Sequence, residues 1–283
     1  MIEARQDHAA DGLEALEVRL FLEAIYARYG YDLREYAAPS ITRRVLVALA
    51  KSGLSDLGAL QHGVLADPAL FGRVLADLTV PVSELFRDPS VFQVFRSRIV
   101  PVLRTYPFFN IWHAGCSTGE EAYSTAIVLR EEGLAERCQI YATDLSAPAL
   151  EHAKQGVYEP RDLAATVARY ERAGGRATLD AHATVAYGQV AMAEALRSRI
   201  LFFQHNLVSD HAFAEMTVVF CRNVLIYFGR DLRQRVVGKI EASLARGAFL
   251  CLGGSERLAL DERGTSFVAF APEDRVYRYQ GAK

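Results

Sequence analysis

The chain has 283 residues, of which 51% are hydrophobic and 23% are charged, and its net charge at neutral pH is −2. This composition is typical of a globular protein with a substantial core, and it excludes a general electrostatic attraction to nucleic acid or anionic membranes. The longest apolar run, at 216–228, is interrupted by Arg222 and Asn223 and cannot cross a bilayer. No apolar signal segment opens the sequence. We therefore expect a cytoplasmic protein with no membrane insertion and no nucleic-acid partner.

The spacing of cysteine and histidine argues against disulfides and metal sites. The four cysteines, at positions 116, 138, 221 and 251, lie far apart and form no C-x-x-C pair. We expect two or more of them to lie on sheet strands as small buried hydrophobic residues, which suits a reducing compartment. The seven histidines lack the H-E-x-x-H spacing or a similar ligand pattern. The sequence therefore predicts no metal ion.

The first 80 residues predict a flexible tail followed by a small all-α domain. Residues 1–12 are small and polar, as in a tail. Helical spacing begins at Leu13, and Gly30 ends the first helix. Ser40 is a plausible N-cap for a second helix that closes at Gly53, and two shorter helices are expected at 55–66 and 68–77, which completes a domain over 13–80. The residues on one face of the first helix are Leu13, Leu16, Leu20, Ala24 and Ile25.

The second predicted helix carries an unbalanced positive charge. Arg43, Arg44 and Lys51 lie on it, and no acidic residue occurs between Ser40 and Ser52. Two interpretations stay open, namely a solvated face and a docking surface for an acidic partner helix.

Residues 81–90 predict an interdomain linker. Pro81 and Pro89 bracket this stretch, and Ser83 and Arg87 are four residues apart, so they would point the same way on a helical turn. Arg87 could form a salt bridge across the seam between the domains. Alternatively, its planar guanidinium could hold both oxygens of a carboxylate.

The remainder, 91–283, begins with the pattern of an open α/β sheet. A helix at 91–103 leads to an apolar strand at 111–114, a glycine turn at 115–119 and a helix at 120–132. Gly115 lets the backbone approach a ligand closely, and the free N–H groups of the following helix favour polar or negative ligand groups. A second strand, at 139–143, ends at Asp144, which is well placed to bind both ribose hydroxyls of a nucleoside. Ser146 and Pro148 then open another helix, and the repeated β-then-α units predict a doubly wound parallel sheet.

An excursion interrupts this rhythm before the last strands. Residues 156–204, and most clearly about 168–204, are irregular or strand-rich, and a strand returns at 200–203. The next strand, at 217–220, runs into Arg222 and Asn223, at the strand end where open sheets build their sites. Asn223 could equally be an ordinary turn residue, and Tyr227 a half-buried core aromatic. An amphipathic helix at 231–245, a strand at 249–252 and a hairpin-like pair at 267–270 and 276–279 complete the chain.

Four linked motifs resemble the CheR-type chemotaxis receptor methyltransferases, over about residues 13–280. They are LTVPVSELFRD (78–88), AGCSTGEEAYS (114–124), IYATDLS (140–146) and FCRNVLIYF (220–228), while HNL (205–207) and GGSERL (253–258) fit as well. The resemblance implies a helical N-terminal domain, a seven-stranded methyltransferase sheet with a small β excursion, and S-adenosylmethionine as cofactor, with S-adenosylhomocysteine as product. It also implies methyl transfer to glutamate side chains in the cytoplasmic helical domain of chemoreceptors.

The resemblance also implies roles for individual residues. Arg87 would orient the acceptor carboxylate, and Tyr227 would lie near the transferred methyl group. Glu121, or less favourably Glu120, would bind the nucleoside together with Asp144. The other residues implied on the cofactor side are Ser83, Gly115, Asn206, Leu207, Arg222 and Asn223.

Two departures from the family pattern put details in question. Pro81 and Ser83 stand where many relatives carry Asn and Thr, so one side-chain hydrogen bond to the cofactor is in doubt. Acidic and basic residues nearly balance over 13–80, which predicts weaker electrostatic docking on an acidic receptor than in relatives with a more basic second helix. Whether the excursion at 156–204 binds a receptor tail peptide stays open.

Glutamate methylation would need no general base, because a glutamate carboxylate is already ionised at neutral pH. The enzyme would work mainly by alignment in a dry cleft. Three other functions are weighed against it. A methyltransferase for nucleic acid or a small molecule would need a different sequence after the fourth strand, a non-catalytic adenosylmethionine-binding scaffold would show no turnover, and a nicotinamide oxidoreductase is disfavoured by the glycine spacing.

Overall fold

The computed structural model describes residues 3–78, 83–212, 215–258 and 266–281, with side chains from residue 12 onward. The chain divides into two compact units. The helical unit consists of Met1–Val80 with Tyr227–Arg235, and the sheet unit consists of Pro81–Ile226 with Val236–Lys283. Pro81, where the sequence departs from the family pattern, lies outside the described residues.

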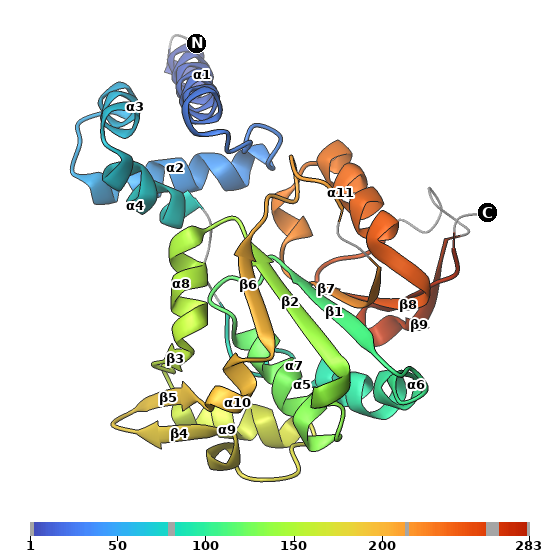
Figure 1. Cartoon of the computed structure of the whole chain (residues 1–283). Coiled ribbons are helices and arrows are strands. Elements are labelled where there is room, and N and C mark those ends of the chain that lie inside the picture. The colour runs from blue at the N-terminus through green and yellow to red at the C-terminus, as the bar shows by residue number, and fades with distance from the viewer. Residues whose placement is uncertain (1–2, 79–82, 213–214, 259–265, 282–283) are drawn as a thin grey trace. The chain divides into compact units, whose positions relative to one another are not determined.

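The helical unit contains the four predicted helices (Figure 1). They are α1 (Glu3–Tyr29), α2 (Ala38–Ser52), α3 (Leu57–Ala66) and α4 (Pro68–Leu78). Gly53 closes α2 in the left-handed conformation, as predicted. The predicted cap at Ser40 is wrong, because α2 begins at Ala38 and has no side-chain cap. Asp56 caps α3 by accepting a hydrogen bond from the Ala59 N–H at 2.8 Å.

Helix α1 differs from its prediction in where it begins and in which face it buries. Its backbone is helical from Glu3, inside the stretch 1–12 that the sequence indicated as a tail. The leucines at 13, 16 and 20 are 57%, 39% and 51% exposed. From residue 12 onward, the buried residues of the helix are Val18, Phe21, Leu22 and Ile25. The predicted face is therefore right only for Ile25, which is buried, whereas Val18, Phe21 and Leu22 fill the core in place of the three leucines.

The sheet unit is built on a seven-stranded sheet, which confirms the predicted methyltransferase-type architecture. The strand order is β6-β2-β1-β7-β8-β10-β9. The first five strands in this order are parallel to their neighbours, whereas β10 is antiparallel to both β8 and β9. The strands are β1 (Phe109–Ala114), β2 (Cys138–Asp144), β6 (Ile200–Gln204), β7 (Met216–Cys221), β8 (Leu244–Leu252), β9 (Phe267–Ala271) and β10 (Val276–Tyr279).

The order of the strands reverses between β1 and β7. From β1 the chain builds outward through β2 to β6 and then returns to the other side of β1 with β7 and β8. Open α/β sheets bind ligands at such a switch point, outside the carboxyl ends of the strands. This topology therefore predicts that the ligand site is formed by the segments that follow β1, β2 and β7.

A second, three-stranded antiparallel sheet accounts for the predicted excursion. Its order is β3-β5-β4, formed by β3 (Val157–Tyr158), β4 (Ala183–Ala186) and β5 (Gln189–Met192). It begins before residue 168, since β3 pairs with β5. Helix α9 (Leu163–Arg172) lies within the same stretch of chain. Residues 200–204 return to the main sheet, as predicted.

Helices connect the strands of the main sheet (Figure 1). Leading into β1, the chain winds through α5 (Pro89–Val94), a π-helical turn (Phe95–Ile99) and α6 (Val100–Leu103). The remaining α-helices are α7 (Glu120–Glu131), α8 (Ala147–Gln155), α10 (Glu194–Arg197) and α11 (Arg230–Ser243), and short 3-10 turns occur at Ala135–Arg137, Leu179–Ala181, Leu225–Tyr227 and Pro272–Asp274.

The cysteines are free and buried, as the sequence predicts. Cys138, Cys221 and Cys251 lie on β2, β7 and β8, and Cys116 lies in the glycine turn. Among the described residues, none of the helices combines the length and hydropathy of a membrane span.

Candidate functional site

The glycine turn after β1 is shaped by close backbone packing. Gly115 has a φ of 76°, and a Cβ built on it would lie 2.5 Å from a methyl group of Val224. The N–H groups of Gly115 and Cys116 both donate to the Thr143 carbonyl, at 2.8 and 2.9 Å. Both the left-handed backbone and the lack of space require glycine here. The turn therefore places the start of α7 beside the ends of β2 and β7.

Asp144 ends β2 as predicted and faces the glycine turn. Its carboxylate accepts hydrogen bonds from the Ser117 N–H at 2.8 Å and the Ser146 N–H at 2.9 Å. Burial raises the pKa of Asp144, and the backbone N–H groups of Ser146 and Ser117 offset this only in part. Each oxygen of a carboxylate can accept more than one hydrogen bond, so Asp144 retains capacity for a hydroxyl ligand. Its ribose-binding role stays a prediction.

Arg222 is the buried centre of a charge network at the end of β7. Its side chain is 1% exposed and bridges two carboxylates, Glu121 at 2.7 Å and Asp88 at 2.6 Å. Burial opposes ionisation of Glu121, but Arg222 and His113 outweigh it and lower the pKa of that carboxyl. The buried Nε of Arg222 has no hydrogen-bond partner among the described residues. The structure thus brings Glu121 and Arg222 together, and it adds Asp88, which the sequence did not indicate.

His113 on β1 is a further member of this network that sequence reasoning missed. Its ring is fully buried, stacks on Phe220 and contacts Glu121 through Nδ1 at 2.9 Å. In the sequence it is one polar residue inside an apolar strand, without a spacing motif to mark it. Only the pairing of neighbouring strands discloses its role in holding Glu121.

Glu120, the alternative to Glu121, lies in a separate set of contacts. It accepts a hydrogen bond from the Thr118 hydroxyl at 2.7 Å and interacts with the Ser83 side chain. Burial raises the pKa of Glu120, whereas these hydrogen bonds act in the opposite direction. Ser83 therefore contacts the first turn of α7, and its role on the cofactor side stays a prediction.

Arg87 lies in a strained loop, and residues 83–88 do not form the helical turn that would align it with Ser83. Its neighbours Phe86 and Asp88 have φ values of 55° and 53°, which are uncommon for residues other than glycine. The fully buried Phe86 anchors the loop by donating its N–H to the Ser124 hydroxyl at 2.9 Å. Strained backbone of this kind is typical of functional loops that the surrounding structure holds in place.

Asn206 and Leu207 follow β6, next to the end of β2. The His205 N–H donates to the Asp144 carbonyl at 3.1 Å, and this ties the loop to the candidate ribose site. The Asn206 side chain accepts a hydrogen bond from the Val208 N–H at 2.9 Å, and Leu207 is buried. Both predicted residues thus lie in one tight turn beside Asp144.

Asn223 has a left-handed backbone, with a φ of 61°. A buried carboxylate, that of Glu256, accepts a hydrogen bond from its N–H at 2.9 Å. The loops that carry the candidate site residues contain four non-glycine residues with positive φ, namely Phe86, Asp88, Ser117 and Asn223. Neither the strain nor the role of Glu256 could be read from the sequence.

Tyr227 belongs to the helical unit, whereas the other candidate site residues belong to the sheet unit. The guanidinium of Arg44 lies over its ring, 4.1 Å from the centroid. Arg44 is buried and also donates to the Leu78 carbonyl at 2.6 Å. The prediction that Arg44 belongs to an accessible docking surface is therefore wrong, because its side chain is used within the unit.

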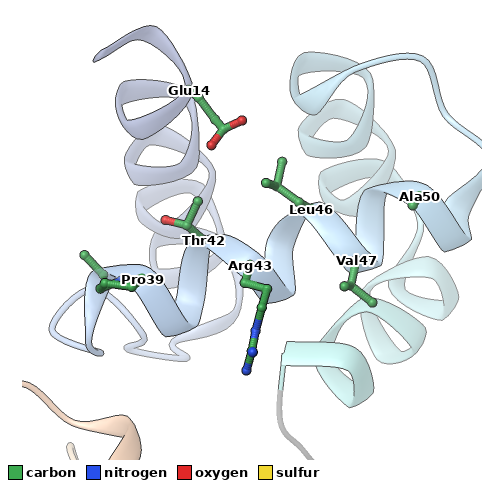
Figure 2. A pocket seen from close by; sticks show the side chains of 8 residues that line it. Glu14, Pro39, Thr42, Arg43, Leu46, Val47 and Ala50 are labelled. Atoms are coloured by element: carbon green, nitrogen blue, oxygen red, sulfur yellow. The ribbon is translucent and has the colours of Figure 1, made fainter. Parts of the chain in front are cut away.

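The other two predicted docking residues are accessible but differ in their surroundings. Lys51 forms an ion pair with Asp77. Arg43 is exposed and lines a groove of about 910 Å³ on the helical unit (Figure 2). The groove is mostly apolar, with Glu14 of α1 on one side, and the other lining residues come from α2: Ala38, Pro39, Thr42, Leu46, Val47 and Ala50.

The structure combines a seven-stranded α/β sheet with a glycine turn, an acidic residue at the end of β2 and a charge network around Arg222 at its switch point. Comparison of the sequence with known protein families identifies two matching domains. Residues 81–271 match the CheR methyltransferase SAM-binding domain, and residues 16–79 match the CheR methyltransferase all-alpha domain. The chain therefore belongs to the CheR methyltransferase family and contains an S-adenosylmethionine-binding methyltransferase domain, which confirms the resemblance noted in the sequence.

Two relatives illustrate the extent of the similarity. The Pseudomonas putida protein named Cher3 is 45% identical over 93% of this chain and 96% of its own length. The chemotaxis protein methyltransferase Cher2 of the same organism is 31% identical over 87% of this chain and 90% of its own length. Both comparisons cover the helical and the sheet units.

Proposed function

We propose that the protein transfers a methyl group from S-adenosylmethionine to glutamate side chains of chemoreceptors, forming glutamate methyl esters. The observation that carries this proposal is the group of site residues beside Asp144 at the switch point, in a chain with both domains of its family. The cytoplasmic compartment expected from the four unpaired cysteines belongs to the same proposal.

The residues of this site suit adenosylmethionine. The tight turn at Gly115 allows the backbone to approach a ligand closely, and Asp144 can accept hydrogen bonds from ribose hydroxyls. Arg222 is buried and keeps one donor, its Nε, without a partner among the described residues. When bound, the cofactor would supply the electrophilic methyl group.

The protein's own task would be to align the acceptor and exclude water. A glutamate carboxylate is ionised at neutral pH and needs no base. His113 is fully buried and already contacts Glu121, so its role is to hold that carboxylate. Arg87 would hold the acceptor carboxylate with its planar fork, and Tyr227 would fix the acceptor or the methyl group through its hydroxyl. Alignment of this kind can supply on the order of 7 kcal/mol of the barrier or more.

We further propose that the receptor docks on the groove of α2, with Arg43 facing an acidic residue of the receptor helix. The groove offers an apolar floor with one exposed cation, which suits an amphipathic helix with an acidic margin. Arg44 does not belong to this surface, because its side chain is buried against Tyr227. Leu46 and Val47 take its place as contact residues.

The proposed activity is tested by incubating the protein with tritiated adenosylmethionine and membranes that contain chemoreceptors. We expect label on the receptor that alkali releases as methanol, since glutamate methyl esters hydrolyse in base. Binding of adenosylmethionine without label transfer to any receptor preparation would favour the non-catalytic scaffold instead.

The docking surface is tested in the same assay with Arg43→Gln. We expect a several-fold higher KM for the receptor with unchanged affinity for S-adenosylhomocysteine, and added salt should weaken the wild type in the same way. Arg73→Gln, at an exposed arginine of α4 outside the groove, is the matched control. Equal KM values for both variants would rule out this docking surface.

A further inference from the structure

The motif GGSERL at 253–258 contains the buried acidic residue Glu256, whose contacts extend beyond its hydrogen bond with Asn223. Glu256 is 3% exposed and follows the end of β8. None of the described cations forms a salt bridge with it. A buried carboxylate without a cation is costly unless hydrogen bonds replace its hydration. Hydrogen-bond donors must therefore surround the Glu256 carboxylate.

Four backbone N–H groups donate to the Glu256 carboxylate. One oxygen accepts from Val224 at 2.9 Å and Ile226 at 3.2 Å. The other accepts from Asn223 at 2.9 Å and Gly253 at 2.6 Å. Three of these donors belong to one segment, 223–226, which directly follows Arg222. Hydrogen bonds to an ionised acceptor are stronger than neutral ones, so this carboxylate fixes the segment's backbone.

The neighbouring Gly253 supports the same arrangement. A Cβ built on it would lie 2.8 Å from the Asn223 nitrogen and 2.8 Å from a Glu256 oxygen. A side chain at this position would push the two segments apart. By contrast, a Cβ built on Gly254 meets nothing within 4 Å.

We propose that Glu256 is a positioning residue, which holds 223–226 so that Arg222 and Asn223 are presented to the cofactor. Asn223 has a left-handed backbone, and the carboxylate of Glu256 binds its N–H in that conformation. The same segment leads directly into Tyr227, the proposed residue near the transferred methyl group. The inference rests on the proposed function, in which Arg222 and Asn223 form part of the adenosylmethionine site.

The test compares Glu256→Gln with Glu132→Gln by calorimetry of S-adenosylhomocysteine binding and by thermal unfolding. Glutamine keeps the size but offers only one acceptor oxygen, so two of the four N–H groups would face an NH2 donor. We expect Glu256→Gln to bind the product roughly tenfold more weakly or worse. Glu132 is equally buried but pairs with Arg96, Arg104 and Arg176, so its variant should lose thermal stability while affinity stays within about twofold.

A second pair of variants leaves Glu256 itself unchanged. Gly253→Ala should weaken product binding in the same way, because the added methyl group intrudes on Asn223 and Glu256, whereas Gly254→Ala should bind like the wild type. Glu256→Asp keeps both oxygens and should recover part of the affinity lost in Glu256→Gln. If Glu256→Gln fails to fold, the glycine pair and Glu256→Asp decide the question.

The outcomes separate this inference from the proposed function. Normal product affinity in Glu256→Gln and Gly253→Ala, with reduced affinity in Asn223→Ala, would overturn the positioning role and leave the proposed site in place. A wild-type protein that binds neither adenosylmethionine nor its product would overturn the proposed function itself. Weaker binding in both Glu256→Gln and Gly253→Ala, with normal binding in both controls, would support the inference.

Discussion

Asp144 is a half-buried carboxylate that backbone N–H groups hold in place. Two backbone N–H groups fix its orientation, while burial raises its pKa. A raised pKa means that the carboxylate begins to take up a proton at a higher pH than an ordinary aspartate. If a ligand binds only the ionised form of Asp144, its affinity should begin to fall at a higher pH than it would with an ordinary aspartate.

We expect Asp144→Ala to weaken binding of adenosylmethionine and adenosylhomocysteine alike, because the ribose is common to both. Each lost hydrogen bond to a charged acceptor should cost about 1.5–3 kcal/mol at most. Calorimetry with both ligands measures the effect. Asp162→Ala, which removes only the cap of α9, serves as control. Unchanged affinity in Asp144→Ala would remove this residue from the site.

Arg87 should depend on the shape of its guanidinium as well as on its charge. A lysine carries the same charge but cannot hold both oxygens of a carboxylate. We expect Arg87→Lys to keep the fold and most product affinity while kcat falls on the order of a hundredfold. Tyr227→Phe should lose less, because only one hydroxyl contact disappears.

The competing interpretation of Arg87 is a structural salt bridge, and it predicts a different pattern. Lysine would then replace it well, and Arg87→Ala would mainly lower the melting temperature. Measurement of kcat and melting temperature for the three variants distinguishes the two, and near-normal turnover of Arg87→Lys would contradict catalytic positioning.

At the level of elements, Glu131 at the end of α7 connects several segments of the sheet unit. It accepts hydrogen bonds from the His182 ring at 3.0 Å, the Arg176 N–H at 3.2 Å and the Tyr170 hydroxyl, and it pairs with Arg96. Burial opposes its ionisation, but these partners prevail and lower its pKa to about 2. The network anchors α9 and the small sheet region to α7.

This network predicts a pH-dependent contribution to stability. Because the pKa of Glu131 is lower in the folded protein than its ordinary 4.5, its contribution is complete above about pH 4.5 and is lost as the pH falls towards 2. Glu131→Gln should lower the unfolding free energy by roughly 3 kcal/mol at pH 7. Urea unfolding at pH 7 and pH 3 should show this difference shrinking. The exposed Glu136→Gln should show neither effect.

At the scale of the whole molecule, the chain leaves the sheet unit after Ile226 and contributes Tyr227–Arg235 to the helical unit. Phe228 is buried there against the Tyr36 ring, with centroids 5.1 Å apart. The Ala37 N–H donates to the Tyr227 carbonyl at 2.8 Å, and the Gly229 N–H donates to the Glu35 carbonyl at 3.0 Å. The helical unit is thus completed by a segment from far along the sequence.

We expect Phe228→Ala to lower the unfolding free energy by about 3–5 kcal/mol, since a large buried aromatic side chain is removed. Phe108→Ala, at an exposed phenylalanine, should change it by about 0.5 kcal/mol or less. Denaturant unfolding of both variants measures the difference. Equal stability of the two would show that this segment does not hold the helical unit together.

The sequence determined the class of the fold, the order of its elements and most of the candidate site. Helical periodicity, glycine at the helix end and β-then-α units act locally, so the four N-terminal helices, β1, α7 and β2 follow from neighbouring residues. Gly115, Asp144 and Arg222 were identifiable because a residue at the end of a parallel strand lies at the functional edge of the sheet.

The tertiary structure alone decided which polar residues meet and which apolar residues of a helix are buried. Leu13, Leu16 and Leu20 share a predicted face with Ile25, yet α1 buries Ile25 together with Phe21 and leaves the three leucines exposed, because the choice depends on the surface presented by α3. Arg44 was expected on the surface, but Tyr227, far along the chain, provides its partner. His113 and Glu256 act through contacts between β1, α7, β7 and the segment after β8. Such contacts depend on strand order and side-chain packing, so no local pattern of residues can specify them.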